Sequence, residues 1–330
     1  MRLLVLGGTG FVGGATVTEG VRRGWSVTVF NRGLHGVVPP GVHRLRGDRT
    51  APDGLAALAG GGWDLVVDTW DGAPRAALDA ARVLADSVGH YVYVSSGSVY
   101  RDPSAHGLDE DSPVVDADAD SVDGDYPQLK AGAERAVREV FGDRALIARA
   151  GLILGPGEDV GRLPWWLRRV ERGGDVLAPG PAGLSVQYVD VRDLAGWMLD
   201  AGARRLGATV NAVGRRVQTT MGELLDACVA ATGADARLRW TDPARIIAAG
   251  VEPWSDLPIW MPNGHPYRGL LEQDVSRAHA AGLTCRPVAE TVADTWQWLR
   301  EVGAVPPRAG RPHRSSIGLD PIREAAVLAA

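Results

Sequence analysis

The sequence predicts an α/β protein, in which a Rossmann doubly wound parallel sheet is followed by a smaller α/β C-terminal substrate-binding region. Two observations predict this fold class. Short apolar runs alternate with amphipathic stretches through the first half of the 330 residues, as expected for a parallel sheet with helices on both faces. In addition, the glycine-rich stretch VLGGTGFVGG follows the first apolar run and leads into the first amphipathic stretch, where a phosphate-binding turn is expected.

The first half of the chain accounts for the sheet and its first helices. A short apolar run alone does not distinguish a strand from a buried helix, so the regular alternation carries the assignment. Strands are expected at residues 2–6, 26–30, 42–48, 63–69, 90–96 and 144–150. Helices are expected at residues 11–24, 73–88 and 129–141.

The second half is less regular from about residue 155 onward. Its expected elements are a short helix within 155–174, a strand and helix at 186–203, a strand at 208–213, a helix at 221–233 followed by the stretch RLRW, an irregular segment rich in proline and tryptophan at 241–266, a helix at 290–303 and a tail at 306–330. The tail is predicted to end in a helix, with Asp320 as its N-cap and Pro321 in its first position.

These patterns suggest two domains. The predicted dinucleotide-binding domain covers residues 1–155 together with returning segments near 185–213. The predicted substrate-binding region covers residues 156–184 and 214–330. A chain of this length is sufficient for two domains of ordinary size.

The composition is typical of a globular protein, with 45% hydrophobic and 23% charged residues. A net charge of −5 predicts no partnership with nucleic acid or an anionic membrane. The two cysteines, Cys228 and Cys285, lack metal-ligand spacing, so no metal site is expected and a reducing compartment is favoured. The apolar N-terminus is too short for a signal peptide or a membrane span, and a cytoplasmic location is expected.

Gly7, Gly10 and Gly13 are spaced three residues apart in the glycine-rich turn. Such glycines allow a tight turn, close approach of a pyrophosphate and close packing of helix on strand. The helix that follows offers free N–H groups and its positive end to the phosphates. The turn lacks the Gly-Lys-Ser/Thr ending of nucleoside-triphosphate loops, so it predicts dinucleotide binding. The alternative is a glycine turn without a ligand.

The end of the second strand bears on the choice of dinucleotide. Enzymes specific for NAD usually have an acidic residue there, which binds the adenosine ribose. This sequence has Asn31 and Arg32 instead, and an arginine can pair with the 2′-phosphate of NADP. NADP is therefore predicted in preference to NAD. The alternative is that Arg32 is a solvated loop residue.

Tyr126 and Lys130 are four residues apart at the start of an alanine-rich helical pattern. Residues at this spacing share one face of a helix. The pair is either a chance surface contact or a phenol whose pKa is lowered by a nearby ammonium group. Pro127 indicates that Tyr126 lies at the start of the helix rather than within it.

The glycine turn, the strand end YVSSGSVY and the Tyr126–Lys130 pair occur in an order that resembles the short-chain dehydrogenase/reductase superfamily, in particular its extended, epimerase/dehydratase-like branch, over nearly the whole chain. The resemblance implies that Tyr126 is the general acid/base, that Lys130 supports it and holds the nicotinamide ribose, and that Ser96 orients the reacting oxygen. Ser96 is matched through the shared Val-Tyr ending, and Ser98 is the weaker match. The predicted cofactor contacts are Gly7, Thr9, Gly10, Phe11, Val12, Gly13, Asn31, Arg32, Asp48, Arg49, Asp68, Thr69, Ser95 and Lys130.

Two departures from the family pattern narrow the expected reaction. Related sugar-nucleotide dehydratases carry a Thr-Asp-Glu triplet near the serine, but the stretch SSGSVY contains no carboxylate, so dehydration is not expected. Many sugar-nucleotide enzymes of this branch have an asparagine where this chain has Leu152. That difference weakens the prediction of a nucleotide-diphosphate-sugar substrate.

The sequence therefore predicts an NADP-dependent oxidoreductase that reduces or oxidises a carbonyl, imine or alcohol of a small molecule, with tyrosine as proton donor. The alternative enzyme is an NAD-dependent epimerase of a sugar or related substrate. An alternative of another class is a cofactor-binding regulatory or RNA-associated protein on the same fold. A homodimer is expected only by analogy with the family.

Features of the second half bear on the substrate, although each has a purely structural alternative. Tryptophans form either the core or an aromatic pocket, and they are Trp165, Trp166, Trp240, Trp254 and Trp260. The acid-rich loop at residues 102–125 is either a solvated surface or an attractor of a cationic substrate. Asp190 and Asp193 are expected to fix a strand–helix junction rather than to act in catalysis.

Overall fold

The central sheet is parallel throughout, as the alternating pattern predicts. The computed structural model describes residues 1–34, 36–305 and 317–329. Within this part of the chain, seven strands pair in the order β10-β6-β5-β4-β1-β2-β3. They are β1 (Arg2–Leu6), β2 (Ser26–Asn31), β3 (His43–Arg46), β4 (Trp63–Asp68), β5 (Val88–Ser96), β6 (Ala145–Ala150) and β10 (Ala208–Ala212).

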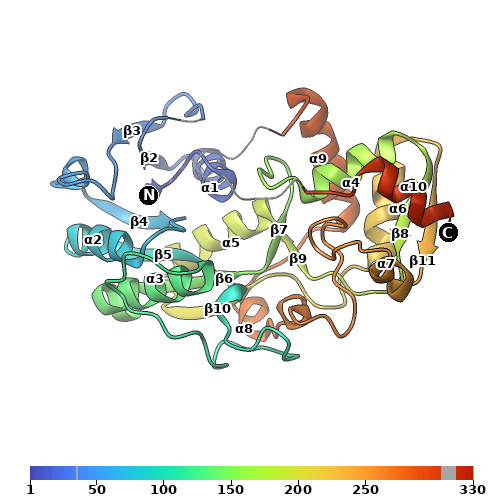
Figure 1. Ribbon diagram of the computed structural model, residues 1–330. Helices are drawn as coiled ribbons and strands as arrows, with labels where there is room; N and C mark the ends of the chain where they lie inside the picture. Colours follow the sequence, from blue (N-terminus) through green and yellow to red (C-terminus); the bar gives the residue numbers. More distant parts are fainter. Residues whose placement is uncertain (35, 306–316, 330) are drawn as a thin grey trace.

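The strand order reverses between β1 and β4, and ligands of doubly wound folds bind at such a switch point. Helices α1 (Phe11–Arg22) and α5 (Val191–Ala203) cover one face of the sheet. Helices α2 (Pro74–Leu84) and α3 (Tyr126–Phe141) cover the other face (Figure 1). The predicted Rossmann fold is confirmed, because both faces are covered and the central strands are buried along their length.

The rest of the chain forms a second region beside the sheet, at the right of Figure 1. Strands β8 (Gly174–Pro179) and β11 (Ala236–Thr241) pair with each other, as do β7 (Leu152–Leu154) and β9 (Tyr188–Asp190). The helices here are α4 (Arg162–Glu171), α6 (Met221–Thr232), α7 (Pro243–Ala248), α9 (Val288–Val302) and α10 (Pro321–Ala329). Helix α8 (Ser276–Ala280) instead packs against the sheet beside β10. Short 3₁₀ turns along the chain are η1 (Ala56–Leu58), η2 (Gly97–Val99), η3 (Gly142–Arg144) and η4 (Arg268–Leu271).

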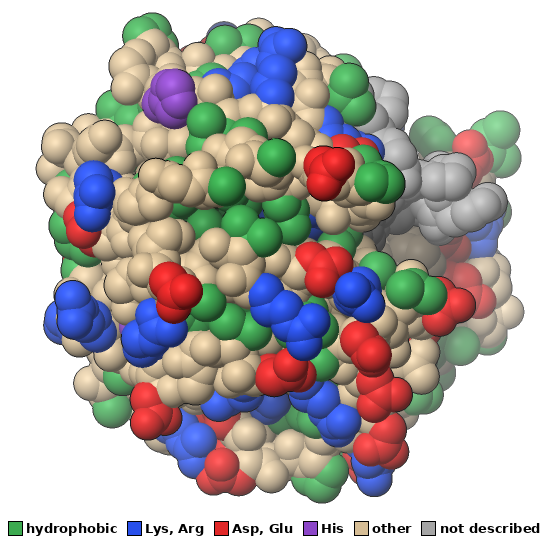
Figure 2. All heavy atoms as spheres, turned by 90° about the vertical axis from the view of Figure 1, so that its left-hand side faces the viewer, with side chains coloured by type: hydrophobic (Ala, Val, Ile, Leu, Met, Phe, Trp, Pro, Cys, Tyr) green, Lys and Arg blue, Asp and Glu red, His purple; other side chains and the backbone are tan. Residues whose placement is uncertain are grey.

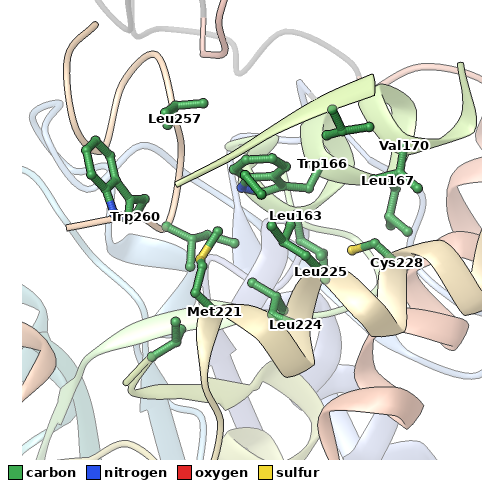
Figure 3. Close-up of a cluster of buried hydrophobic side chains, with 14 of the residues drawn as sticks. Leu163, Trp166, Leu167, Val170, Met221, Leu224, Leu225, Cys228, Leu257 and Trp260 are labelled. Carbon is green, nitrogen blue, oxygen red and sulfur yellow. The ribbon is translucent and has the colours of Figure 1, made fainter. Parts of the chain in front are cut away.

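Helices α4 and α6 build the core of this second region (Figure 3). Trp166 from α4 and Trp260 from the segment between α7 and η4 are fully buried, and both lie in the same apolar cluster. Trp165 and Trp254 are partly buried against that cluster, whereas Trp240 on β11 is 40% exposed. Core packing therefore accounts for Trp166 and Trp260.

The C-terminal helix was predicted correctly. Helix α10 begins at Pro321, and the Asp320 carboxylate accepts a hydrogen bond from the Ile322 N–H at 2.8 Å. Residues 306–316 of the predicted tail lie outside the described part of the chain. No helix among the described residues is long and apolar enough to cross a membrane. The division into two domains at the predicted boundaries stays a prediction.

Candidate active site

The glycine turn lies between β1 and α1 and requires glycine at two positions. Gly7 has a positive φ of 93°, in the region that favours glycine. A Cβ atom on Gly13 would lie 2.3 Å from the Gly7 carbonyl oxygen, so a side chain there would push the helix off the strand. Gly10 is the N-cap of α1 and provides no capping side chain. The first N–H groups of α1 therefore remain available to a phosphate, and the turn fits a dinucleotide.

The end of β2 adds polar groups beside this turn. The Asn31 Oδ1 accepts a hydrogen bond from the Gly33 N–H, while its buried Nδ2 has no partner among the described residues. Arg32 is exposed. Hydrogen bonds from Thr50 lower the pKa of Asp48, and the positive charge of Arg32 acts in the same direction. Arg32 and Asp48 thus lie in the same neighbourhood, with a buried amide donor still to be satisfied.

Arg49 and Asp68 were predicted as cofactor contacts, but the structure pairs them with each other. Both Arg49 Nη atoms lie 3.0 Å from the Asp68 carboxylate oxygens, and both side chains are buried. The Tyr91 hydroxyl donates to the same carboxylate at 2.7 Å. Burial, reinforced by Asp68, raises the pKa of Tyr91, so the phenol keeps the proton that it donates. Sequence reasoning missed this pairing, because the two residues come from different parts of the chain.

Thr69 and Trp70 follow Asp68 at the carboxyl end of β4. The Thr69 hydroxyl donates to the Leu6 carbonyl at 3.0 Å, and its oxygen lies 2.5 Å from the position of a Cβ on Gly7. The Trp70 ring lies against the Arg49 guanidinium, with its carbon 4.8 Å from the ring centroid. Thr69 therefore lies against the glycine turn, and its contact with a cofactor stays a prediction. Trp70 is a neighbour that was not predicted.

Ser96 lies at the carboxyl end of β5 and caps the turn η2. Its Oγ accepts hydrogen bonds from the Ser98 N–H at 3.2 Å and from the Ser98 hydroxyl at 3.0 Å. An N–H can only donate, so the Ser96 hydroxyl proton is left for another oxygen. The neighbouring Ser95 is buried, and its hydroxyl donates to Glu134 at 2.5 Å. Its proton is therefore already used, and the predicted cofactor contact of Ser95 stays a prediction.

Glu134 lies one turn beyond Lys130 on α3 and is buried. Its carboxylate also accepts from Arg149 Nε at 3.0 Å and from Arg149 Nη2 at 2.8 Å. This network ties α3 to β5 and β6 directly behind Ser96. Neither residue was predicted, because their partners are far apart in sequence.

Tyr126 is the first residue of α3, and Asp125 is its N-cap. The position at the helix start agrees with the prediction made from Pro127. Tyr126 is 40% exposed, whereas Lys130, one turn later, is only 3% exposed. The Lys130 Nζ donates to the Trp70 carbonyl at 2.6 Å and to the Val94 carbonyl at 2.7 Å.

Lys130 is unusual in the chain as a whole, which is a signal that the sequence analysis missed. It is the single lysine among the 35 lysines and arginines. Its ammonium group lies 4.9 Å from the Tyr93 ring centroid and makes no ion pair with a described carboxylate. A buried ammonium offers three N–H groups, and carbonyls occupy two of them. One N–H therefore remains for a ligand beside Tyr126.

A cavity of about 910 Å³ opens beside the glycine turn, but it extends away from Ser96 and Tyr126. It runs along α1 toward α5 and is bounded by Phe11, Glu158 and Trp298. Gln273 lies close to the turn that follows Ser96, since its side-chain amide lies 2.2 Å from the position of a Cβ on Gly97. A residue distant in sequence therefore borders the turn that Ser96 caps.

The acid-rich loop and the strand–helix junction also have clear structural roles. Asp111 and Asp116 in the loop pair with Arg277 and Arg101, respectively. Asp190 accepts the Arg192 N–H at 2.8 Å and so caps α5, which confirms its predicted structural role. The described residues contain no group of three or more His, Cys, Asp and Glu side chains that could hold a metal ion.

Solved structures share the fold of this chain across most of its length. The Bordetella bronchiseptica enzyme WbmH in complex with NAD+ is 19% identical, with a TM-score of 0.68 over 92% of this chain and 99% of that chain. The Thermus thermophilus UDP-glucose 4-epimerase with NAD is 21% identical, with a TM-score of 0.60 over 91% and 99%. The Bacillus cereus UDP-glucuronic acid 4-epimerase with NAD is 13% identical, with a TM-score of 0.64 over 92% and 99%. At these identities the likeness concerns the fold.

Comparison with curated proteins gives no significant match. A family profile, described as NAD dependent epimerase/dehydratase family, matches residues 3–212. The matched range contains the glycine turn, Ser96, Tyr126 and Lys130, so it confirms the resemblance that these motifs carry. The chain belongs to the NAD dependent epimerase/dehydratase family.

Proposed function

We propose that the chain is an epimerase that oxidises one secondary alcohol carbon of a small molecule and reduces it again, with NAD retained through the cycle. The family match and the fold shared with NAD-bound epimerases support this reading over a net reductase. The observation that carries the proposal is the buried Lys130 ammonium, which keeps one N–H free a single helical turn from Tyr126.

Three side chains have complementary roles in the proposed reaction. Tyr126 is exposed enough to meet a substrate, and it takes or returns the alcohol proton at its phenolic oxygen. Lys130 lies one helical turn further along α3 and contributes the positive charge of a buried ammonium group. Ser96, whose oxygen already accepts from Ser98, donates its hydroxyl proton to the reacting oxygen. When bound, the nicotinamide cofactor supplies the hydride chemistry.

The residues around the glycine turn would hold the cofactor. Gly10, Phe11 and Val12 lead into the uncapped N-terminus of α1, which suits the pyrophosphate. The unpartnered Asn31 amide and the Asp48 carboxylate are placed for the adenosine part. Thr69 lines the turn from β4, and Thr9 lines it from the loop itself.

A net NADP-dependent reductase is the second candidate, and one specific observation favours it. The end of β2 carries Asn31 and Arg32 in place of an acidic residue, and Arg32 is exposed. An exposed guanidinium there suits a 2′-phosphate, which only NADP has. The reductase would release its cofactor after each turnover, whereas the epimerase would keep it.

The proposed substrate is a small molecule other than a nucleotide-diphosphate sugar. Leu152 is 5% exposed and joins the apolar core of the second region, so it offers no amide to a sugar nucleotide. An aromatic or cationic substrate remains the working proposal, because Trp165 and Trp254 are only partly buried and the acid-rich loop follows β5. No nucleic acid or membrane partner is proposed.

A homodimer also stays a proposal. The molecular face that includes α2 carries interspersed acidic and basic side chains (Figure 2). Arg82 on α2 and Glu139 on α3 pair at 3.0 Å, and Arg75 pairs with Asp79 within α2. A dimer formed through these helices would cover paired charges rather than an apolar surface.

The first experiment asks what the purified protein carries and what it can bind. Protein denatured after purification is analysed for released nucleotide, and emptied protein is titrated with NADH and NADPH by nicotinamide fluorescence. Tightly held NAD supports the epimerase, and exchangeable NADPH supports the reductase.

Turnover is then measured on alcohols and carbonyls with wild-type protein and Tyr126→Phe. We expect the variant to bind nucleotide normally but to lose turnover by at least about 100-fold, because the proton donor is gone. If the protein neither carries nor binds a nucleotide, the enzyme proposal fails and a regulatory protein on the same fold becomes the better reading.

A further inference from the structure

The Asp68 carboxylate lies at the end of β4 and is completely buried. It accepts hydrogen bonds from both Arg49 Nη atoms, from the Tyr91 hydroxyl and from the Trp70 N–H at 3.0 Å. The last bond fixes the chain just after the strand ends. Asp68 therefore fixes the first part of the loop between β4 and α2, in addition to pairing with Arg49.

The Trp70 ring is anchored as firmly as its N–H group. Its Nε1 donates to the Ala73 carbonyl at 2.9 Å, and the Arg49 guanidinium lies against the ring. The Trp70 carbonyl is then left facing α3 and β5, where it accepts from Lys130 Nζ at 2.6 Å and from the Tyr93 hydroxyl at 3.0 Å. Asp68 and Arg49 thus hold the residue whose oxygen holds Lys130.

The two carbonyls that bind Lys130 differ in how they are supported. Val94 belongs to β5, which is paired with β4 and β6 on either side. Trp70 belongs to a loop and has no strand pairing of its own. A lysine side chain has a flexible four-carbon stem, so its ammonium is oriented only as well as its acceptors are. The Trp70 acceptor depends on the contacts from Asp68 and Arg49.

We propose that Asp68 and Arg49 are positioning residues, which fix Trp70 and thereby orient the Lys130 ammonium. The proposal rests on the role of Lys130 in the proposed function. It gives the two residues a task that differs from the cofactor contact expected from the sequence. They act through Trp70 and do not themselves need to touch substrate or cofactor.

The charge balance explains why both members of the pair are needed. A buried ion pair is weak evidence for stability, since apolar residues of similar size often serve as well. A lone Asp68 carboxylate could still accept the Trp70 N–H, but it would leave a buried negative charge close to Lys130. Arg49 neutralises that charge and at the same time packs on the Trp70 ring.

The test uses the fact that Lys130 is the single lysine of the chain. Isotopically labelled lysine gives one side-chain spectrum, which needs neither substrate nor nucleotide. In wild-type protein we expect separate chemical shifts for the two ε-methylene protons, because the ammonium is held in one orientation. In Asp68→Ala, which removes the acceptor of the Trp70 N–H, we expect the two shifts to merge toward the value of free lysine.

Two further variants separate positioning from a general loss of packing. Tyr91→Phe removes a different hydrogen bond to the same carboxylate, and we expect the two shifts to stay apart. Asp68→Asn keeps an oxygen for the Trp70 N–H, and we expect most of the separation to return. If Asp68→Ala does not fold, the double variant Asp68→Ala with Arg49→Met replaces it in the test. The second substitution removes the buried guanidinium that would otherwise be unpaired.

Separate shifts in a folded protein without the Asp68 acceptor would overturn the proposal. Merged shifts in Tyr91→Phe would also overturn it, since any disturbance of the carboxylate would then suffice. Failure of this proposal is distinguishable from failure of the proposed function. A protein that binds no nucleotide can still show that the orientation of the Lys130 ammonium depends on Asp68.

Discussion

The choice of lysine at position 130 has a physical reason at the scale of a single residue. The chain uses arginine at every other basic position, and arginine has a broad planar head with five donors. The space around Lys130 Nζ is instead bounded by two carbonyl oxygens at 2.6 and 2.7 Å and by the Tyr93 ring. These contacts suit a compact ammonium, whereas a guanidinium is larger and planar.

We therefore predict that Lys130→Arg is as damaging as Lys130→Met. Each should lower turnover by about 100-fold or more, since the free N–H beside Tyr126 is lost in both. Arg135→Lys is the matched control, because it makes the reverse exchange at an exposed position of the same helix. Steady-state kinetics and nucleotide titration check the result. Full activity in Lys130→Arg would show that charge alone is required.

The residues predicted correctly in position are those whose partners lie close in sequence. The glycine spacing and the Tyr126–Lys130 spacing are local, so the turn and the helix follow directly from them. Arg49 follows β3, and Asp68 ends β4, 19 residues further along the chain. No local sequence pattern shows that their side chains pair. The family resemblance placed both among the predicted cofactor contacts, and those contacts stay a prediction.

At the scale of one element, helix α3 is defined by its N-terminal cap. The Asp125 carboxylate accepts the Gln128 N–H at 2.9 Å, and the Gln128 side chain accepts the Asp125 N–H at 3.0 Å. This reciprocal capping box makes Tyr126 the first residue of the helix. The cap therefore decides where the proposed proton donor, Tyr126, lies.

Removing this cap should affect catalysis as well as stability. We expect Asp125→Ala to lower the free energy of unfolding by about 1 kcal/mol and also to reduce kcat, because the first turn frays. Thr220→Ala removes the capping box of α6, where Thr220 accepts the Glu223 N–H at 3.2 Å, and should cost similar stability with unchanged kcat. Chemical denaturation and kinetics on both proteins give the comparison. Equal kcat in the two variants would contradict the role given to the cap.

Elements of the second half of the chain were harder to predict than those of the sheet. Strands β7 and β8 and the helices α7 and α8 were not expected. Strand β7 has only three residues and follows β6 after a single glycine, and α8 has five residues. Such short elements are stabilised by partners distant in sequence, so their own residues carry little periodic signal.

At the scale of the whole molecule, Glu158 lies on the segment that joins β7 to α4 in the second region. Its carboxylate is fully buried and accepts the Arg162 N–H at 2.8 Å and the Leu163 N–H at 3.1 Å, at the start of α4. Burial raises the pKa of Glu158 to about 7, although these bonds and the Arg162 charge oppose the shift. The charged form is thus disfavoured in the folded protein.

The raised pKa has a definite sign for stability. The folded protein holds the Glu158 proton more tightly than the unfolded chain does, so the contribution to stability is complete below pH 4.5 and is lost as pH rises through 7. We expect the free energy of unfolding to fall by about 3 kcal/mol relative to Glu158→Gln over this window. Denaturation at a series of pH values, with exposed Glu290→Gln as control, measures the difference. A pH-independent difference would show that Glu158 is not the group that titrates.

The two ends of the sheet have a consequence for association between molecules. Edge strands are templates on which further chains can pair and aggregate. At one edge, β3 carries His43, Arg44 and Arg46, which discourage stacking of a second strand. At the other, the Asn211 N–H of β10 donates to the Glu110 carboxylate at 2.7 Å, so a side chain of the same molecule already occupies it. Both edges of the sheet therefore carry features that disfavour the addition of a strand from another molecule.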